Sequence, residues 1–166
     1  MSSLIDPSTS APPRSPGRDV RQIDPRGLRF AAAVTTAVLA VALVAVGTPI
    51  GAVALSIQAV VFALGSLVGL GAQPYGVFFR RVIRPHLEAP TELEDPAPPR
   101  FAQAVGLIFV LIAGAALALG SLTVVTVALA AALAAAFLNA AFGYCLGCEF
   151  FLIAKRVTSR LAPARI

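Results

Sequence analysis

Two cysteines, Cys145 and Cys148, offer the clearest chemistry in this 166-residue chain, because they form a C-x-x-C pair. This spacing can close a small disulfide ring, or it can place two thiolates on one metal ion. Structural zinc takes four ligands, and His86 is the only other Cys or His in the sequence. A typical zinc site would therefore need two chains, with two thiolates from each. We predict redox chemistry instead, with Cys145 and Cys148 as the catalytic residues, no metal and no cofactor.

Two amide side chains, Gln58 and Asn139, are further candidates because they lie well inside apolar stretches of the sequence. A buried amide needs hydrogen-bond partners. We expect both side chains to make hydrogen bonds between helices, and the alternative is that they bind a substrate. No charged residue and no His lies in the middle of these stretches, which argues against an ion-coupled transporter that uses buried carboxylates.

The elements that position these residues follow from the composition. The chain is 58% hydrophobic and 13% charged, whereas a soluble domain has about 45–50% apolar and about 25% charged residues. Two charge-free stretches, 30–79 and 101–148, are each too long for one membrane span of about 20 residues. Gly-Thr-Pro at 47–49 and Gly-Ser at 120–121 divide them. We therefore predict an all-α membrane protein with four transmembrane helices in two short hairpins. The predicted spans are residues 28–46, 50–72, 101–119 and 122–144.

The basic residues predict the orientation of this transmembrane domain, 23–156. All 13 Lys and Arg residues lie near the start of the first span, between the second and third spans, or after the fourth. The positive-inside rule then places both termini and the loop 73–100 in the cytoplasm. We predict a multi-pass membrane protein. Residues 1–22 would form a disordered cytoplasmic tail and residues 157–166 a basic one.

The same topology explains the net charge of +5 without a nucleic-acid partner.

Asp24 and Pro25 have the residue types that begin a helix, as an N-cap and a first helical position. They are expected to start the first span.

The last apolar run, 122–153, is too long for a straight span. Its 32 residues would make a helix of about 48 Å, against a hydrocarbon core of about 30 Å. Gly143 and Gly147 are the candidate break points, and the sequence does not choose between them. The cysteine pair would lie near the cytoplasmic boundary, where a permanent structural disulfide is not expected. A break at Gly143 would let a new helix begin near Tyr144 and place the pair at a helix N-terminus, which favours thiolates. The charge of Glu149 would oppose them.

Several motifs occur together in this chain: Gln58 with the apolar run after it, Pro-Tyr-Gly at 74–76, the Arg-rich stretch 79–85, the segments 92–96 and 99–103, and the cysteine segment 143–149. Through them, residues 22–156 resemble the bacterial integral membrane family catalogued as domain of unknown function 4395. The resemblance implies a location in the bacterial inner (plasma) membrane, and it implies no established activity. Members of such families tend to be associated with thioredoxin-like and sulfurtransferase proteins, which implies a role in thiol or sulfur handling.

Three hypotheses follow. In the first, a protein held in the lipid bilayer exchanges electrons or sulfur with a cytosolic thioredoxin-like or sulfurtransferase protein through Cys145 and Cys148. In the second, it is a small transporter or channel for a sulfur species, with Gln58 and Asn139 along the path. In the third, it is a structural membrane subunit whose cysteines pack between helices. A homodimer is compatible with all three.

Overall fold

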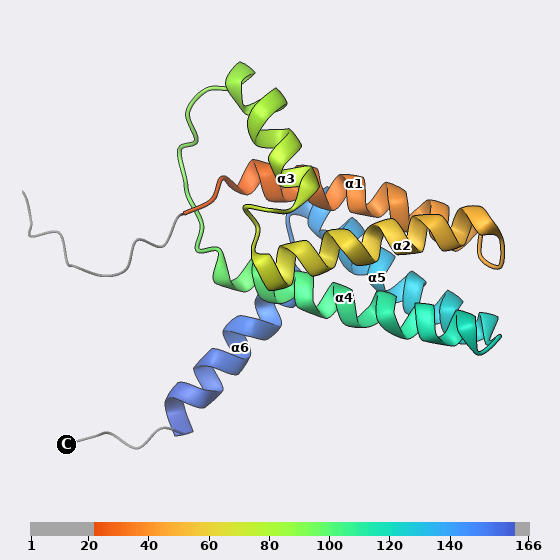
Figure 1. The fold of residues 1–166 in the computed structure, drawn as a ribbon. Helices are drawn as coiled ribbons and strands as arrows, with labels where there is room; N and C mark the ends of the chain where they lie inside the picture. Colours follow the sequence, from red (N-terminus) through yellow and green to blue (C-terminus); the bar gives the residue numbers. More distant parts are fainter. Residues whose placement is uncertain (1–21, 162–166) are drawn as a thin grey trace, which may run out of the picture.

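The computed structural model describes residues 22–161, and four long apolar helices dominate this part of the chain (Figure 1). They are α1 (Pro25–Val44), α2 (Pro49–Ala63) with its π-helical continuation η1 (Leu64–Val68), α4 (Ala97–Ala118) and α5 (Leu122–Phe142). Each span is long and apolar enough to cross a membrane. The predicted all-α fold of four spans in two hairpins is confirmed.

The four helices form a closed bundle in which each helix packs on two others. Helix α1 contacts α2 and α5, and α4 contacts the same two helices from the other side. The core at their centre is built from small and branched residues, which let the backbones approach closely. Its most buried members include Leu39, Ala42, Val110, Ala113, Val125 and Leu129. Large apolar side chains in the middle of the spans, such as Val60 and Ile108, are exposed on the outside of the bundle, as expected for a lipid-facing surface.

The two hairpin turns lie where the sequence predicted them, between Val44 and Pro49 and between Ala118 and Leu122. The hydroxyl of Thr48 caps α2 by accepting a hydrogen bond from the Gly51 N–H at 3.3 Å. Figure 1 shows both turns at one end of the bundle. The first residues of α1 and α4 lie at the opposite end, together with the short helix α3 (Pro74–Phe78) and α6 (Leu146–Leu161).

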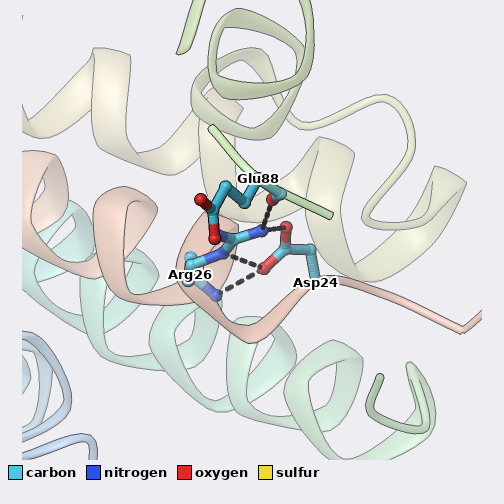
Figure 2. Close-up of polar contacts among 3 residues, drawn as sticks. All are labelled: Asp24, Arg26 and Glu88. Carbon is cyan, nitrogen blue, oxygen red and sulfur yellow. Dashed lines mark hydrogen bonds and ion pairs between the residues drawn. The ribbon is translucent and has the colours of Figure 1, made fainter. Parts of the chain in front are cut away.

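The start of α1 is fixed by Asp24 and Arg26 (Figure 2). The Asp24 carboxylate accepts a hydrogen bond from the Arg26 backbone N–H at 3.0 Å and forms an ion pair with the Arg26 guanidinium, also at 3.0 Å. That guanidinium reaches the backbone oxygen of Glu88 at 2.9 Å. The expected N-cap at Asp24 is therefore confirmed. The hydrogen bond from Arg26 holds the pKa of the Asp24 carboxyl below its ordinary value.

The segment predicted as the loop 73–100 contains helical structure. Its first half forms α3 (Pro74–Phe78), the π-helical turn η2 (Phe79–Ile83) and the 3-10 turn η3 (Arg84–His86). The side chain of Phe79 is 4% exposed and packs on α1, where its ring lies 5.8 Å from that of Phe30.

Helix α4 begins at Ala97, earlier than the predicted residue 101, since prolines are tolerated in a first helical turn. The Arg100 guanidinium donates hydrogen bonds to the backbone oxygens of Ser66 at 2.7 Å and Leu67 at 2.8 Å. These bonds join the start of α4 to the end of the second span.

Two of the sequence predictions concern the chain ends. The tail predicted at 1–22 lies outside the described residues except for Gln22. In the tail predicted at 157–166, residues up to Leu161 belong to α6, and 162–166 lie outside the described residues.

Candidate thiol–disulfide site

The fourth span ends at Gly143, which is one of the two break points that the sequence proposed. Gly143 has φ 69° and ψ 12°, a left-handed conformation that costs a residue with a Cβ about 1–2 kcal/mol. Its N–H donates to the backbone oxygen of Asn139 at 3.0 Å, and the Tyr144 N–H donates to the backbone oxygen of Leu138 at 3.3 Å. These two bonds satisfy the last carbonyls of α5 and turn the chain out of the bundle.

The cysteine pair lies at the N-terminus of the helix that follows. Cys145 immediately precedes α6, and its backbone oxygen accepts a hydrogen bond from the Glu149 N–H at 3.1 Å. Its Sγ accepts another from the Cys148 N–H at 3.3 Å. Cys145 therefore occupies the N-cap position, with sulfur in the place of the usual side-chain oxygen. The arrangement predicted for a break at Gly143 is present.

Cys145 and Cys148 are joined by a disulfide bond, with their Cα atoms 5.2 Å apart. The disulfide is one of the two states that a redox pair visits. The expectation that the disulfide is not a permanent structural one stays a prediction.

Close contact with α4 holds the first turn of α6 in place. A Cβ added to Gly147 would lie 2.6 Å from the Ala102 Cβ and 2.7 Å from the Ala102 Cα, so only glycine fits there. One turn further on, the Phe151 ring lies 5.7 Å from the Phe101 ring. The second predicted break point, Gly147, thus lies inside α6 and serves helix packing.

A cavity of about 690 Å³ lies between α1, α4 and α5, and the cysteine turn lines it. Its apolar wall is made of aromatic and small residues from the spans, including Ala31, Phe62, Gly106, Phe109, Ala132 and Ala135. Its polar lining includes Arg29, Gln103, Asn139 and Glu149. Such a volume is in the range of small-molecule sites, about 300–1,000 Å³.

One positive charge lies close to the cysteine turn. An Arg29 guanidinium nitrogen donates to the backbone oxygen of Ala141 at 3.5 Å, near the end of α5. The guanidinium lies beside Gly143 and lines the same cavity as both cysteines. Positive charge and a helix N-terminus both favour a thiolate, while the exposed Glu149 in the first turn of α6 opposes it.

The two amides predicted as substrate-binding residues are in different surroundings. The Gln58 side chain is fully buried. Its Nε2 donates to the Thr35 hydroxyl at 3.4 Å, and its Oε1 accepts from the Tyr75 hydroxyl at 3.3 Å. The expected hydrogen bonds between helices are confirmed for Gln58. Burial raises the pKa of Tyr75.

Asn139 instead lines the cavity beside the cysteines, and Gln58 is not among the lining residues. The structure therefore does not bring the two amides together. In the part of the chain from 22 to 161, no group of three or more His, Cys, Asp or Glu side chains is placed to hold a metal ion.

Sequence reasoning missed the cavity and the positions of Arg29 and Gly147 beside it. In the sequence, Arg29 is one of the basic residues that indicate the topology, and Gly147 is a candidate break in the last helix. Both act through residues more than 40 positions away, Ala141 and Ala102. Gly147 directly precedes Cys148, and a glycine within a helix is a weak sequence signal of close helix packing.

These features define an all-α, multi-pass membrane protein with a C-x-x-C pair where its fourth span ends. The family model described as "Domain of unknown function (DUF4395)" matches residues 23–156, and the chain belongs to this family. No curated protein and no solved structure matches the chain.

Proposed function

We propose that this protein is a thiol–disulfide exchange protein of the bacterial inner membrane. In this proposal Cys145 and Cys148 exchange electrons or sulfur with a cytosolic thioredoxin-like or sulfurtransferase protein. The observation that carries the proposal is the hydrogen bond from the Cys148 N–H to the Cys145 Sγ at a helix N-terminus. It gives Cys145 a donor that stabilises the thiolate released during exchange.

The exchange runs through a mixed disulfide. A partner thiolate attacks the Cys145 Sγ, the Cys145–Cys148 bond breaks, and Cys148 leaves as a thiolate that takes up a proton. A second partner thiolate then attacks the partner sulfur bound to Cys145 and releases Cys145. The partner dithiol becomes a disulfide, and the pair in this protein gains two electrons and two protons. The reverse sequence oxidises the pair.

The position of the pair supports a cytosolic partner. The cysteine turn lies at the end of the bundle opposite the two hairpin turns (Figure 1). The hairpin turns carry no Lys or Arg, whereas Arg26, Arg100 and Lys155 belong to the end that carries the cysteines. By the positive-inside rule this end faces the cytoplasm, which gives soluble thiol proteins access to the pair.

The proposal is tested by trapping the mixed disulfide. The Cys148→Ser protein, purified in lipid nanodiscs, is mixed with a thioredoxin that keeps only its attacking cysteine, activated as a mixed disulfide with thionitrobenzoate, and is separated on a non-reducing gel. We expect Cys145 to form a covalent complex that a reductant releases. The Cys145→Ser protein is the matched control and should form much less of it. Equal trapping by both variants, or by neither, would contradict the roles given to the two cysteines.

The alternative of a small transporter for a sulfur species has one observation in its favour, the cavity lined by Asn139. It predicts uptake into proteoliposomes that falls when Asn139 is replaced. Gln58, the other residue assigned to this path, makes its hydrogen bonds to Thr35 and Tyr75 inside the bundle.

A further inference from the structure

We propose that the cavity beside the cysteine pair binds a lipid-soluble quinone, and that this quinone exchanges two electrons with Cys145 and Cys148. This inference rests on the proposed function and deepens it, because it names the second redox partner of the same site. The partner is identified by its chemistry: an apolar molecule with a flat ring, two carbonyl oxygens and a hydrocarbon tail.

The shape and lining of the cavity fit such a molecule. Three of its polar residues come from the ends of the spans nearest the cysteines: Arg29 near the start of α1, Gln103 near the start of α4, and Asn139 one turn before the end of α5. Glu94, Asp95 and Glu149 also line it, from outside the four spans. Deeper in the spans the wall is largely apolar, with Phe109 and Ala132 among its residues and Thr35 as a polar one. A quinone head would lie at the polar end, and its tail would follow the apolar wall.

The polar end offers donors for quinone oxygens. Carbonyl oxygens accept hydrogen bonds, and the Asn139 amide and the Arg29 guanidinium can donate them. The structure shows no side-chain hydrogen bond for Asn139 to any residue within 22–161. Its amide is therefore available to a ligand, unlike that of Gln58, whose partners are Thr35 and Tyr75.

The cavity also reaches the outer surface of the bundle at the level of a membrane span. Ala131 lines it and is exposed, although it lies in the middle of α5. In the membrane this surface faces lipid, so a molecule dissolved in the bilayer can enter from the side. An apolar route of this kind favours a lipid-soluble oxidant over a water-soluble one.

The electron balance closes with these two partners. When the dithiol is oxidised, the two S–H bonds of Cys145 and Cys148 break and the S–S bond forms. The two electrons and two protons pass to the quinone, whose two carbonyl oxygens become the hydroxyls of a hydroquinone. Both couples transfer two electrons, so no further oxidant is needed.

The test uses the reduced full-length protein in nanodiscs, mixed with a short-chain alkyl benzoquinone or, in a second arm, an alkyl naphthoquinone. Loss of quinone absorbance and loss of free thiols are followed together, and a reductant must restore the thiols, because a thiol added to the quinone ring would not be restored. We expect both to fall in a one-to-one ratio of quinone to cysteine pair.

The variant that tests the cavity is Ala135→Leu, which adds volume to the wall, and its matched control is Ala134→Leu. Ala134 is exposed on the same helix and does not line the cavity. We expect Ala135→Leu to slow oxidation by the quinone about tenfold, because the larger side chain takes space that the quinone needs. Ala134→Leu should leave the rate unchanged. Binding is read separately in the Cys145→Ser/Cys148→Ser protein, where quinone should raise the unfolding temperature.

The outcomes separate this inference from the proposed function. If the pair exchanges with thioredoxin but no quinone oxidises it, the quinone inference is wrong and the exchange function stands. The inference also fails if quinone oxidises wild type and Ala135→Leu at equal rates, as expected if the cavity only holds a lipid chain. If quinone oxidises the pair but thioredoxin does not exchange with it, the inference stands and the proposed cytosolic partner is wrong.

Discussion

The Sγ of Cys145 accepts a hydrogen bond from the backbone N–H of Cys148 at 3.3 Å, across the first turn of α6. In most helices a Ser, Thr, Asp or Asn oxygen fills this capping role. Here the capping atom is one of the two sulfurs of the C-x-x-C pair. The bond that orders the start of the helix is thus also a bond that stabilises negative charge on Cys145 when the disulfide opens.

This relationship predicts unequal thiols. In the Cys148→Ser protein, Cys145 keeps the capping position and should react with iodoacetamide roughly fivefold faster than Cys148 does in the Cys145→Ser protein, because a helix N-terminus favours the thiolate. The measurement is the rate of alkylation in nanodiscs, followed by mass spectrometry. Equal rates, or a faster Cys148, would show that the cap does not activate Cys145.

The contact of Gly147 with Ala102 predicts that the docking of α6 controls exchange. A Gly147→Ala methyl would overlap the Ala102 backbone, so the first turn of α6 must move away from α4 and the cysteine turn must move with it. We expect exchange with thioredoxin to slow severalfold. The control is Gly114→Ala, because a Cβ on Gly114 meets no atom within 4 Å. Normal exchange in Gly147→Ala would mean that the position of α6 does not matter.

The buried Gln58 predicts a loss of stability when its amide is removed. Gln58→Leu leaves the Thr35 and Tyr75 hydroxyls without the bonds they make to this amide. We expect a loss of about 1 kcal/mol in the free energy of unfolding, the scale of hydrogen bonds between membrane helices. The measurement is unfolding in mixed micelles, with Tyr75→Phe and the double variant completing a cycle.

The control for Gln58 is Ser56→Ala, since among residues 22–161 the exposed Ser56 hydroxyl bonds only to the Ala52 backbone oxygen of its own helix. It should change stability little. Additive effects of Gln58→Leu and Tyr75→Phe would contradict a direct bond between the two residues.

Asp24 predicts a dependence of stability on acid pH. Its pKa in the folded protein lies below the ordinary 3.8, chiefly because of the hydrogen bond from Arg26. The stabilisation is therefore complete above pH 3.8 and is lost as the pH falls through the lower, folded pKa. Asp24→Asn, which still caps the helix, should show a shallower loss of stability on acidification. Identical acid unfolding of the two proteins would contradict the assignment.

The sequence was informative wherever the cause was local. Uncharged runs, Gly-Thr-Pro at 47–49 and the Asp24-Pro25 pair predicted the spans, the first turn and the first helix start, and all three are present. The helical start of the segment 73–100 was missed, since its stability comes from Phe79 packing against α1.

The candidate site was only partly predictable, because much of it depends on contacts between segments that are far apart in the sequence. The cysteine pair is visible as a motif, and Gly143 was one of two local break points. The cavity depends on α1, α4 and α5 coming together, and no periodicity within one helix encodes it. The partner of Gln58 was also hidden, because Tyr75 lies 17 residues away in a helix that was expected to be loop.

The redox activity of Cys145 and Cys148 can be measured in intact cells. Free thiols are alkylated with one reagent, disulfides are reduced, and the released thiols are alkylated with a second reagent, before and after a mild oxidant. We predict that the pair shifts reversibly from dithiol to disulfide and recovers when the oxidant is removed. Cysteines that stay reduced throughout would contradict this prediction and would assign both residues to helix packing, and cysteines that stay oxidised would contradict it and indicate a structural disulfide.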